Sequence, residues 1–258
     1  MVSYKSLSTQ YEKGAKKISV RSKRPKVSVK KDTTLEIEKS NGNYDLHFNK
    51  DGFLVKSFHF ERTPTKIIFA FDKKKRIVKM LQLEQESNIL IGTVEYLYDK
   101  KDRIKKEIHT NCFHNFEDEV NEWAYTYKKN LQIMLIHSLD EEQEDATFYY
   151  HNDLHGRLIE EKGIRNKDEL IYWSKFEYDK KGKLIKEISL DANGKQDGLY
   201  EFFPQENNQS VGYKYSSADK NYSKEYAYQF NERGHWIHQV VSVDGIPQYF
   251  YDRGIEYY

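Results

Sequence analysis

An aromatic pair followed by Asp or Asn recurs along this chain, and this recurrence constrains the fold more than any other feature. The clearest copy is Phe176-Glu177-Tyr178-Asp179, and Tyr96-Leu97-Tyr98-Asp99 is a close second. The residue in the Asp or Asn slot, here called the marker, stands at positions 49, 72, 99, 128, 153, 179, 204, 231 and 252, so successive markers are 21 to 29 residues apart. One β-hairpin with a connecting loop has about this length. The series therefore predicts an all-β array of consecutive antiparallel hairpin repeats.

Each unit also predicts its own turn. The segment Asp179-Lys180-Lys181-Gly182 is typical of a type I turn followed by a left-handed residue. The Asp side chain caps such a turn, and the glycine takes the positive φ that the turn requires. Asp102 replaces the glycine tolerably in its copy. Lys75 is a poorer substitute and predicts a turn that is strained or of another type.

These units resemble the YD repeat of Rhs and teneurin-like proteins, and they look closest to short bacterial proteins that carry only such repeats. The likeness covers roughly residues 40–258 and rests on Tyr98-Asp99, Tyr178-Asp179 and Tyr251-Asp252. It implies an extended antiparallel sheet that coils into a spiral or solenoid-like array of hairpins. The chain is too short to enclose a toxin domain, so the resemblance does not carry toxin delivery over to it.

Basic residues concentrate at the N-terminus. Residues 1–31 hold ten basic groups and one acid, Glu12, which leaves 32 basic and 40 acidic residues in the rest. We expect residues 1–35 to form a basic arm, partly disordered or an edge strand. Residues 36–258 then form the repeat domain, with a closing unit at 228–258. The arm could anchor the chain to an anionic partner, but a solubilising terminus explains it more simply.

The composition predicts neither disulfides nor membrane-spanning helices. Cys112 is the one cysteine, so no intrachain disulfide can form. No apolar run follows the N-terminal charges, and the longest apolar stretches are too short to span a bilayer. The expected location is the cytoplasm if the chain is complete, and the extracellular space or the cell surface if it is a mature fragment.

His151, Asp153 and His155 form the tightest titratable cluster in the sequence. Residues two apart share a face of a strand, so the three side chains could together bind a metal ion. They also occupy the turn of a repeat, where Asp153 fills the marker slot. The turn is the preferred interpretation, and we expect no metal and no cofactor.

No catalytic residue is assigned from the sequence. The acids at positions 72, 99 and 179 follow the repeat, so their turns explain them, and the other acidic clusters fall in predicted loops. Cys112 has His109 and His114 nearby, but a lone cysteine in a strand is more often a small buried hydrophobe. Glycine-rich phosphate loops and hydrolase elbows are absent from the sequence.

We therefore expect a non-catalytic YD-repeat scaffold or binding protein that presents an aromatic and charged sheet face to an unidentified protein or glycan. Two alternatives stay open. One is a carbohydrate-active or other enzyme that uses acids between repeats, and the other is an accessory or immunity-type interaction protein of a toxin system. Self-association is possible, whereas nucleic acid is not the expected partner.

Overall fold

The computed structural model describes residues 14–26, 36–39, 42–60, 63–112, 118–138, 145–166, 168–203, 205–206 and 209–258. These residues form β-strands and no helix, which confirms the all-β prediction. The strands are β1 (Ala15–Lys26), β2 (Glu36–Lys39), β3 (Tyr44–Phe48), β4 (Leu54–His59), β5 (Thr65–Phe71), β6 (Ile77–Glu84), β7 (Leu90–Tyr98), β8 (Ile104–Asn111), β9 (Glu119–Lys128), β10 (Leu131–Ser138), β11 (Ala146–Asn152), β12 (Leu158–Arg165), β13 (Glu169–Tyr178), β14 (Leu184–Leu190), β15 (Gln196–Phe202), β16 (Gln205–Glu206), β17 (Gln209–Ser210), β18 (Gly212–Ser217), β19 (Asn221–Phe230), β20 (Trp236–Val243) and β21 (Ile246–Tyr257).

The chain divides into two compact units, and each is described by itself. Unit 1 comprises Met1–Val94 and Tyr226–Tyr258, and unit 2 comprises Glu95–Glu225. The boundaries fall inside β7 and β19, so neither boundary is a linker. The sequence-based division after residue 35 follows the charge pattern, whereas these units follow the packing of the chain.

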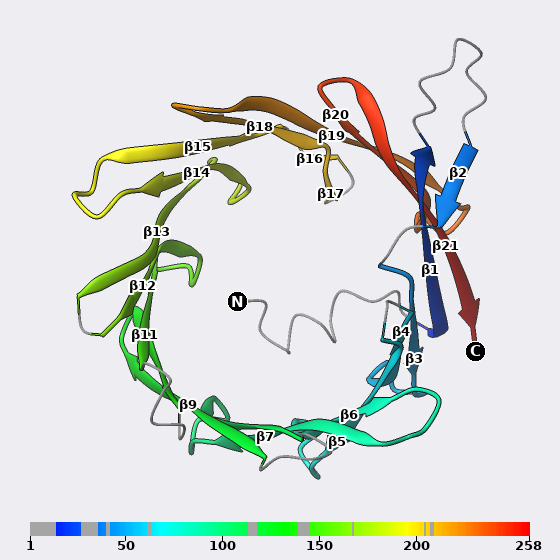
Figure 1. Cartoon of the computed structure of the whole chain (residues 1–258), viewed down its shortest axis with the longest axis horizontal. Coiled ribbons are helices and arrows are strands. Elements are labelled where there is room, and N and C mark those ends of the chain that lie inside the picture. Colours follow the sequence, from blue (N-terminus) through cyan, green and yellow to red (C-terminus); the bar gives the residue numbers. More distant parts are fainter. Residues whose placement is uncertain are drawn as a thin grey trace. The chain divides into compact units, whose positions relative to one another are not determined.

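Unit 2 is a run of neighbouring hairpins (Figure 1). β8 pairs with β9, and antiparallel pairing continues strand by strand to β15, which pairs with β18, followed by β19. The short pair β16–β17 lies between β15 and β18. The marker slot at Pro204 falls there, outside the described residues. This consecutive pairing confirms the predicted hairpin repeats.

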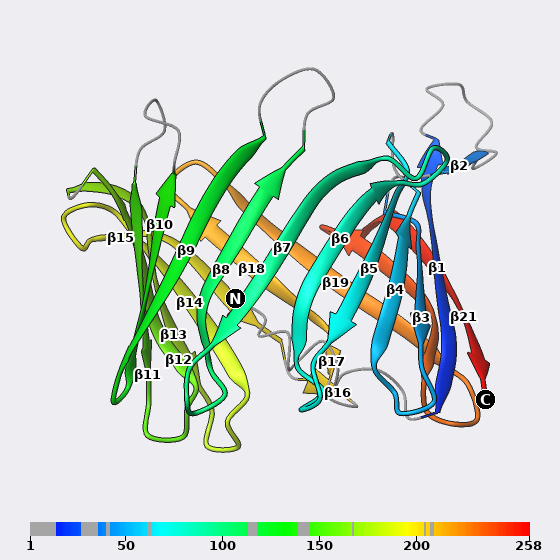
Figure 2. The same cartoon turned by 90° about the horizontal axis from the view of Figure 1, so that it is seen from below.

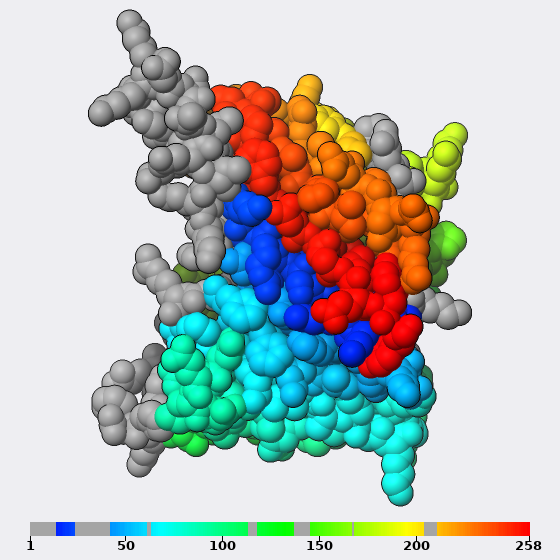
Figure 3. All heavy atoms as spheres, turned by 90° about the vertical axis from the view of Figure 1, so that its right-hand side faces the viewer, coloured from blue at the N-terminus to red at the C-terminus, as the bar shows by residue number. Residues whose placement is uncertain are grey.

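Unit 1 contains a second set of hairpins. Strands β3 to β6 pair in chain order, as Figure 2 shows, and β20 pairs with β21. β1 lies between the two sets, because its residues 17–20 pair with β3 and its residues 15–23 pair with β21. Figure 3 shows the blue N-terminal strand flanked by the red C-terminal strand and by the cyan β3 region.

The pairing of β1 corrects two expectations. A coiled sheet that runs from one end of the chain to the other leaves its first and last strands as edges. Here β1 pairs directly with β21, so the prediction of an open spiral or solenoid is wrong at this point. The prediction of a basic arm or edge strand is also wrong for residues 17–20, which have partner strands on both sides.

Sequence alternation explains why β1 becomes an interior strand. Ile18, Val20 and Ser22 point to one face and are about 1% exposed, and they are the largest fully buried side chains among the described residues. Lys17 and Arg21 occupy the opposite face, as the period of a strand requires. Lys17 and Arg21, two of the basic residues that suggested a solvated arm, are thus on the polar side of a buried strand.

The two units have different cores. The core of unit 1 is largely aliphatic and contains Ala15, Ile18, Val20, Leu46, Phe48 and Leu54. A core cluster of unit 2 consists of Tyr125, Met134 and Tyr150, with further aromatic rings packed around it. Tyrosine hydroxyls need hydrogen-bond partners when they are buried, so polar residues have to accompany the core of unit 2.

Seven turns share one geometry in which the marker organises the backbone. In each, the marker N–H donates to the carbonyl four residues ahead, and the N–H three residues ahead donates back to the marker carbonyl. The marker side-chain oxygen accepts two further N–H groups, from the residues two and four ahead. Six of the seven are predicted markers, and Asp191 takes the marker place in the seventh; the six are Asn49, Asp72, Asp99, Asp153, Asp179 and Asn231.

The residue three positions after each of these markers has a positive φ. Gly182 has φ 80°, whereas Lys75 and Asp102 have φ 62° and 59°. The turn at Lys75 is therefore of the common type, and it is strained because a side chain occupies the left-handed region. This finding decides between the two alternatives that the sequence left open for that turn.

Two predicted markers do not form this turn, and one turn was missed. Lys128 ends β9, and the chain reverses through Lys129, which has φ 39°. Asp252 lies inside β21, opposite His238 on β20. Asp191 forms the same turn as the markers, although no aromatic pair precedes it and it falls between two predicted slots.

The aromatic residue before a marker reaches back to the preceding turn. Tyr178 precedes Asp179, and its hydroxyl donates to the Leu158 carbonyl at 2.7 Å. The Arg157 guanidinium lies 4.9 Å from the centre of the Tyr178 ring. Arg157 in turn donates through Nε to Oδ2 of Asp153, its own marker, at 2.6 Å. One Tyr-Asp pair therefore holds its own turn and the turn of the repeat before it.

The same contact recurs two repeats earlier in unit 2. The Tyr127 hydroxyl donates to the Ile104 carbonyl at 2.7 Å, and the Arg103 guanidinium lies 4.1 Å from the ring centre. Burial raises the pKa of Tyr127 to about 12, so the phenol stays protonated and remains a donor. In unit 1, Phe71 packs edge-on against Phe53 at the corresponding place.

Candidate functional site

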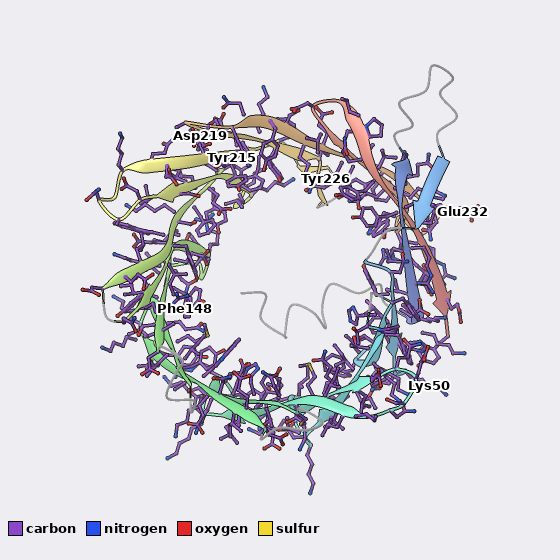
Figure 4. The ribbon with its side chains drawn as sticks, viewed as in Figure 1. Lys50, Phe148, Tyr215, Asp219, Tyr226 and Glu232 are labelled. Carbon is purple, nitrogen blue, oxygen red and sulfur yellow. The ribbon has the colours of Figure 1, made fainter. Side chains whose placement is uncertain are left out.

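One face of the unit 2 sheet collects aromatic side chains from many strands. Residues directly opposite each other in antiparallel strands point to the same face. The register places Tyr125, Met134, Phe148, Gly163 and Tyr172 in one row across five strands. Tyr200, Tyr215 and Tyr222 form another row on the same face. We call this surface the aromatic face; Phe148 and Tyr215 are labelled in Figure 4.

Three glutamates lie within the aromatic face at one position of the repeat. Glu107, Glu161 and Glu187 each stand eight residues after a marker. Each is directly opposite an aromatic residue of the neighbouring strand, and these partners are Trp123, Tyr150 and Tyr200. The sequence-based predictions considered acids in turns and loops and did not single out these three, which lie within strands.

Glu107 is the most deeply buried of the three, with 2% of its surface exposed. Oε1 accepts the Tyr125 hydroxyl at 2.7 Å, and Oε2 lies 3.0 Å from Nε2 of His109. The His109 ring stacks on Trp123 with centroids 4.0 Å apart. Burial and the adjacent carboxylate raise the pKa of Tyr125 strongly, so its hydroxyl acts as a fixed donor. These contacts satisfy the hydrogen-bonding capacity of the buried Glu107 carboxylate, so the cluster has a structural role.

Glu161 and Glu187 form a second acidic pair on the same face. Burial raises the pKa of both carboxyls, and the Glu187 charge raises that of Glu161 further. Ser174, between them on β13, donates to Glu187 at 3.4 Å, a weak hydrogen bond. In the described part of the chain, neither glutamate forms an ion pair with a basic side chain. The pair is therefore suited to hold a proton or to accept donors from a ligand.

The tyrosines next to Glu187 form a continuous cluster of rings. Tyr200 and Tyr215 have centroids 4.6 Å apart, and Tyr215 and Tyr222 have centroids 5.2 Å apart. Tyr213 packs edge-on against Tyr200 at 5.3 Å. The rings are half-buried. Burial and the neighbouring tyrosines raise the pKa of Tyr200, so its hydroxyl stays protonated beside the ring surfaces of the cluster.

The predicted cluster at His151, Asp153 and His155 is not a joint site. Asp153 accepts two backbone N–H groups and the Arg157 side chain. Burial is the largest single influence on its pKa and pushes it upward, but these hydrogen bonds together hold the pKa below the ordinary value. Nδ1 of His151 lies 3.1 Å from Glu160, and His155 is exposed in the turn. Within the described ranges, no group of three or more His, Cys, Asp or Glu side chains could hold a metal ion.

The remaining candidates from the sequence also have structural partners. Burial and Asp118 raise the pKa of the Cys112 thiol, which opposes thiolate formation. His109 is held by Glu107, and His114 lies outside the described residues. Two further histidines, in the closing unit, also have partners: Nδ1 of His235 lies 2.5 Å from the Tyr257 hydroxyl, and Nδ1 of His238 lies 2.7 Å from Oδ1 of Asp252.

Sequence comparison finds no matching family model and no matching curated protein. Solved structures similar to this chain include two porin-like proteins. The one from Bacteroides vulgatus has 9% identity and a TM-score of 0.42, and the match covers 96% of this chain and 99% of that chain. The one from Bacteroides uniformis has 9% identity and a TM-score of 0.37, over 95% and 98% of the two chains.

A Tc holotoxin pore from Photorhabdus luminescens is also similar, with 8% identity and a TM-score of 0.33. That match covers 83% of this chain and 15% of the other. Likenesses this weak establish neither the fold nor the activity of the present chain. No helix among the described residues has the length and apolar composition to cross a membrane.

Proposed function

We propose that the chain is a non-catalytic repeat protein of the YD type and that it binds an extended partner on the aromatic face of unit 2. One observation carries the proposal: β9, β11, β13, β15, β18 and β19 each contribute a ring to the same side of the sheet. Repeat arrays commonly use such continuous surfaces for binding.

The chemistry of the face favours a ligand with both apolar and polar groups. Tyrosine provides a rigid ring and a hydroxyl, which together contact proteins and sugars at low entropic cost. The carboxyls of Glu161 and Glu187 lie among these rings and can accept hydroxyl or amine donors. A protein segment and a glycan both meet these requirements.

The turns and the reach-back tyrosines support the assignment to the YD type. In the turns at Asp153 and Asp179, both members of the Tyr-Asp pair have a structural role. These residues are then not available as catalytic acids, which leaves the strand faces as the surfaces for binding.

A double variant, Tyr200→Ala with Tyr215→Ala, tests this proposal. Wild type and variant would be applied to an array of bacterial and host glycans and to immobilised candidate protein partners. We expect a wild-type signal that the double variant loses. Tyr149→Ala is the matched control, because Tyr149 lies on the opposite face of β11. A signal that survives in the double variant, or a wild-type array that stays blank, contradicts the proposal.

A carbohydrate-active enzyme is the second candidate, and the raised pKa values of Glu161 and Glu187 favour it. Glycosidases use one protonated and one ionised carboxyl. Glu161→Gln and Glu187→Gln would be compared with wild type for release of reducing sugar from any glycan that binds. Release that both variants abolish would replace the binding proposal with an enzymatic one.

A further inference from the structure

One face of the unit 1 sheet carries cations from neighbouring strands. Lys17 on β1 lies directly opposite His47 on β3, and His47 lies directly opposite Lys56 on β4. Arg21 and Lys66 belong to the same face through the alternation of β1 and the pairing of β4 with β5. We call this surface the basic face.

Lys17 and Lys56 flank His47 in this row, and like charges on one face of a sheet repel each other. Burial, together with the charges of Lys17 and Lys56, lowers the pKa of His47, so the imidazole gives up its proton more easily. Unit 2 shows the usual arrangement, with opposite charges in one row: Glu177, Lys186, Glu201 and Lys214. The row in unit 1 lacks this alternation of charge.

The described acids near the row leave Lys56 without an ion-pair partner. Asp45 lies 3.1 Å from Lys17 and 2.7 Å from Arg21, so it binds these two cations. Glu256 on β21 lies opposite Lys17 on the far side from His47. Lys56 forms no ion pair with any described residue. An anion from outside the chain would therefore find its counter-charge at Lys56.

Aromatic rings lie beside these cations on the same face. Phe58 contacts His47 edge-on with centroids 5.2 Å apart, and the Arg21 guanidinium lies 5.0 Å from the centre of the Phe60 ring. Phe58 and Phe60 are half-buried and two residues apart, so they point to one side. Rings and cations alternate across this part of the sheet.

We propose that the basic face binds single-stranded nucleic acid. Proteins that bind single strands combine cations along the phosphate backbone with aromatic side chains on which the bases stack. Lys56 supplies the free cation, and Phe58 and Phe60 supply the rings. Lys56, Phe58 and Phe60 alternate along β4 and the residue after it, whereas Lys17 and His47 belong to β1 and β3 and are brought beside them only by the register, so the sequence did not suggest this partner.

The test is fluorescence anisotropy of a labelled oligothymidylate at several salt concentrations. We expect wild-type binding that weakens with salt. In Lys56→Gln the slope of log affinity against log salt should become shallower by about 0.7, the value for one phosphate contact on a single strand. Phe58→Leu should weaken binding about tenfold through loss of stacking, and Phe58→Tyr should restore it.

Lys175→Gln is the matched control, because Lys175 lies opposite Glu160 in unit 2 and should not affect binding. A chain without residues 1–13 should also bind as wild type does. That deletion spares β1, whereas removal of residues 1–31 would delete a core strand.

Several results would overturn the proposal. One is the absence of binding to the oligothymidylate at low salt. Another is a Phe58→Leu variant that binds as wild type does, since binding would then depend on charge alone. Equal binding to dextran sulfate or to phosphatidylglycerol vesicles would identify a general polyanion surface instead. Loss of binding on deletion of residues 1–13 would assign the activity to the N-terminal arm.

Discussion

Units 1 and 2 use the same type of turn, but they differ in net charge and in the composition of their cores. Unit 1 contains 22 basic and 14 acidic residues, a net charge of +8, whereas unit 2 contains 20 basic and 27 acidic residues, a net charge of −7. The core of unit 1 is largely aliphatic, and that of unit 2 is rich in tyrosine. Asp72 in unit 1 and Asp179 in unit 2 nevertheless form the same hydrogen bonds.

This difference separates the residues that specify the fold from those that distinguish the two units. The markers and their left-handed residues recur because every hairpin needs them. The strand faces vary, because a sheet tolerates many side chains once its register is fixed. We therefore look for function on the faces and for stability in the turns and in β1.

The largest effect is expected in the core of unit 1. Ile18→Ala should lower the free energy of unfolding by about 2–5 kcal/mol, since it leaves a cavity where the side chain is 1% exposed. Ile171→Ala in unit 2 is the control, because Ile171 is 39% exposed and should change stability much less. Urea denaturation measures both, and equal effects would contradict the interior position of β1.

A smaller effect is expected at the buried carboxylate of unit 2. Tyr125→Phe removes the hydroxyl that donates to Glu107 and should lower the free energy of unfolding by about 1.5–3 kcal/mol. Tyr178→Phe removes a bond to a neutral carbonyl and should lower it by about 1 kcal/mol. If denaturation shows the reverse order, Glu107 is not held as described.

A stabilising change is expected at the strained turn of unit 1. Lys75→Gly should raise the free energy of unfolding by about 1 kcal/mol, because glycine adopts the positive φ without strain. Gly182→Ala, at the matching position in unit 2, should lower stability for the same reason. Thermal unfolding of both variants gives the signs, and a destabilised Lys75→Gly would refute the shared geometry.

One carboxyl group in each unit should make the free energy of unfolding depend on pH, and the two dependences should have opposite signs. The pKa of Glu187 is raised from 4.5 by burial, so its contribution is complete at low pH and is lost as pH rises through the folded pKa. Glu187→Gln should therefore stabilise the protein at neutral pH and have little effect below pH 4.5.

Asp45 in unit 1 provides the contrasting case. Burial pushes its pKa upward, but hydrogen bonds from Arg21, Lys17 and Ser19 prevail and hold it below 3.8. Its contribution is lost as pH falls through the folded pKa, so Asp45→Asn should destabilise the protein at neutral pH. Thermal unfolding across the pH range checks both signs, and parallel curves for the two variants would contradict them.

The sequence predicted the local structure well, because local structure depends on residues close in the chain. The turn at Asp179 needs only an Asp and a glycine three positions later, and both are visible in the sequence. Asp252 shows where such reasoning fails. The same Tyr-Asp pair is there, but pairing of β21 with β1 and β20 keeps the segment extended.

The candidate sites could be predicted less well, because they depend on register. Glu107, Glu161 and Glu187 share one repeat position, and alternation would have placed them among the aromatic residues. The sequence-based predictions missed that pattern, because they considered the acids of the turns instead. The basic face gave no signal, since nothing near Lys17 in the sequence indicates that His47 and Lys56 lie opposite it.

A double-mutant cycle on Arg157 and Tyr178 tests most directly the claim that the Tyr-Asp pairs build the fold by linking neighbouring turns. Arg157→Ala, Tyr178→Ala and the double variant would be unfolded in urea, with Arg157→Ala and Tyr149→Ala as the control cycle. We predict a coupling free energy of at least about 0.5 kcal/mol for the first pair and none for the control. Additive effects of Arg157 and Tyr178 would contradict the claim.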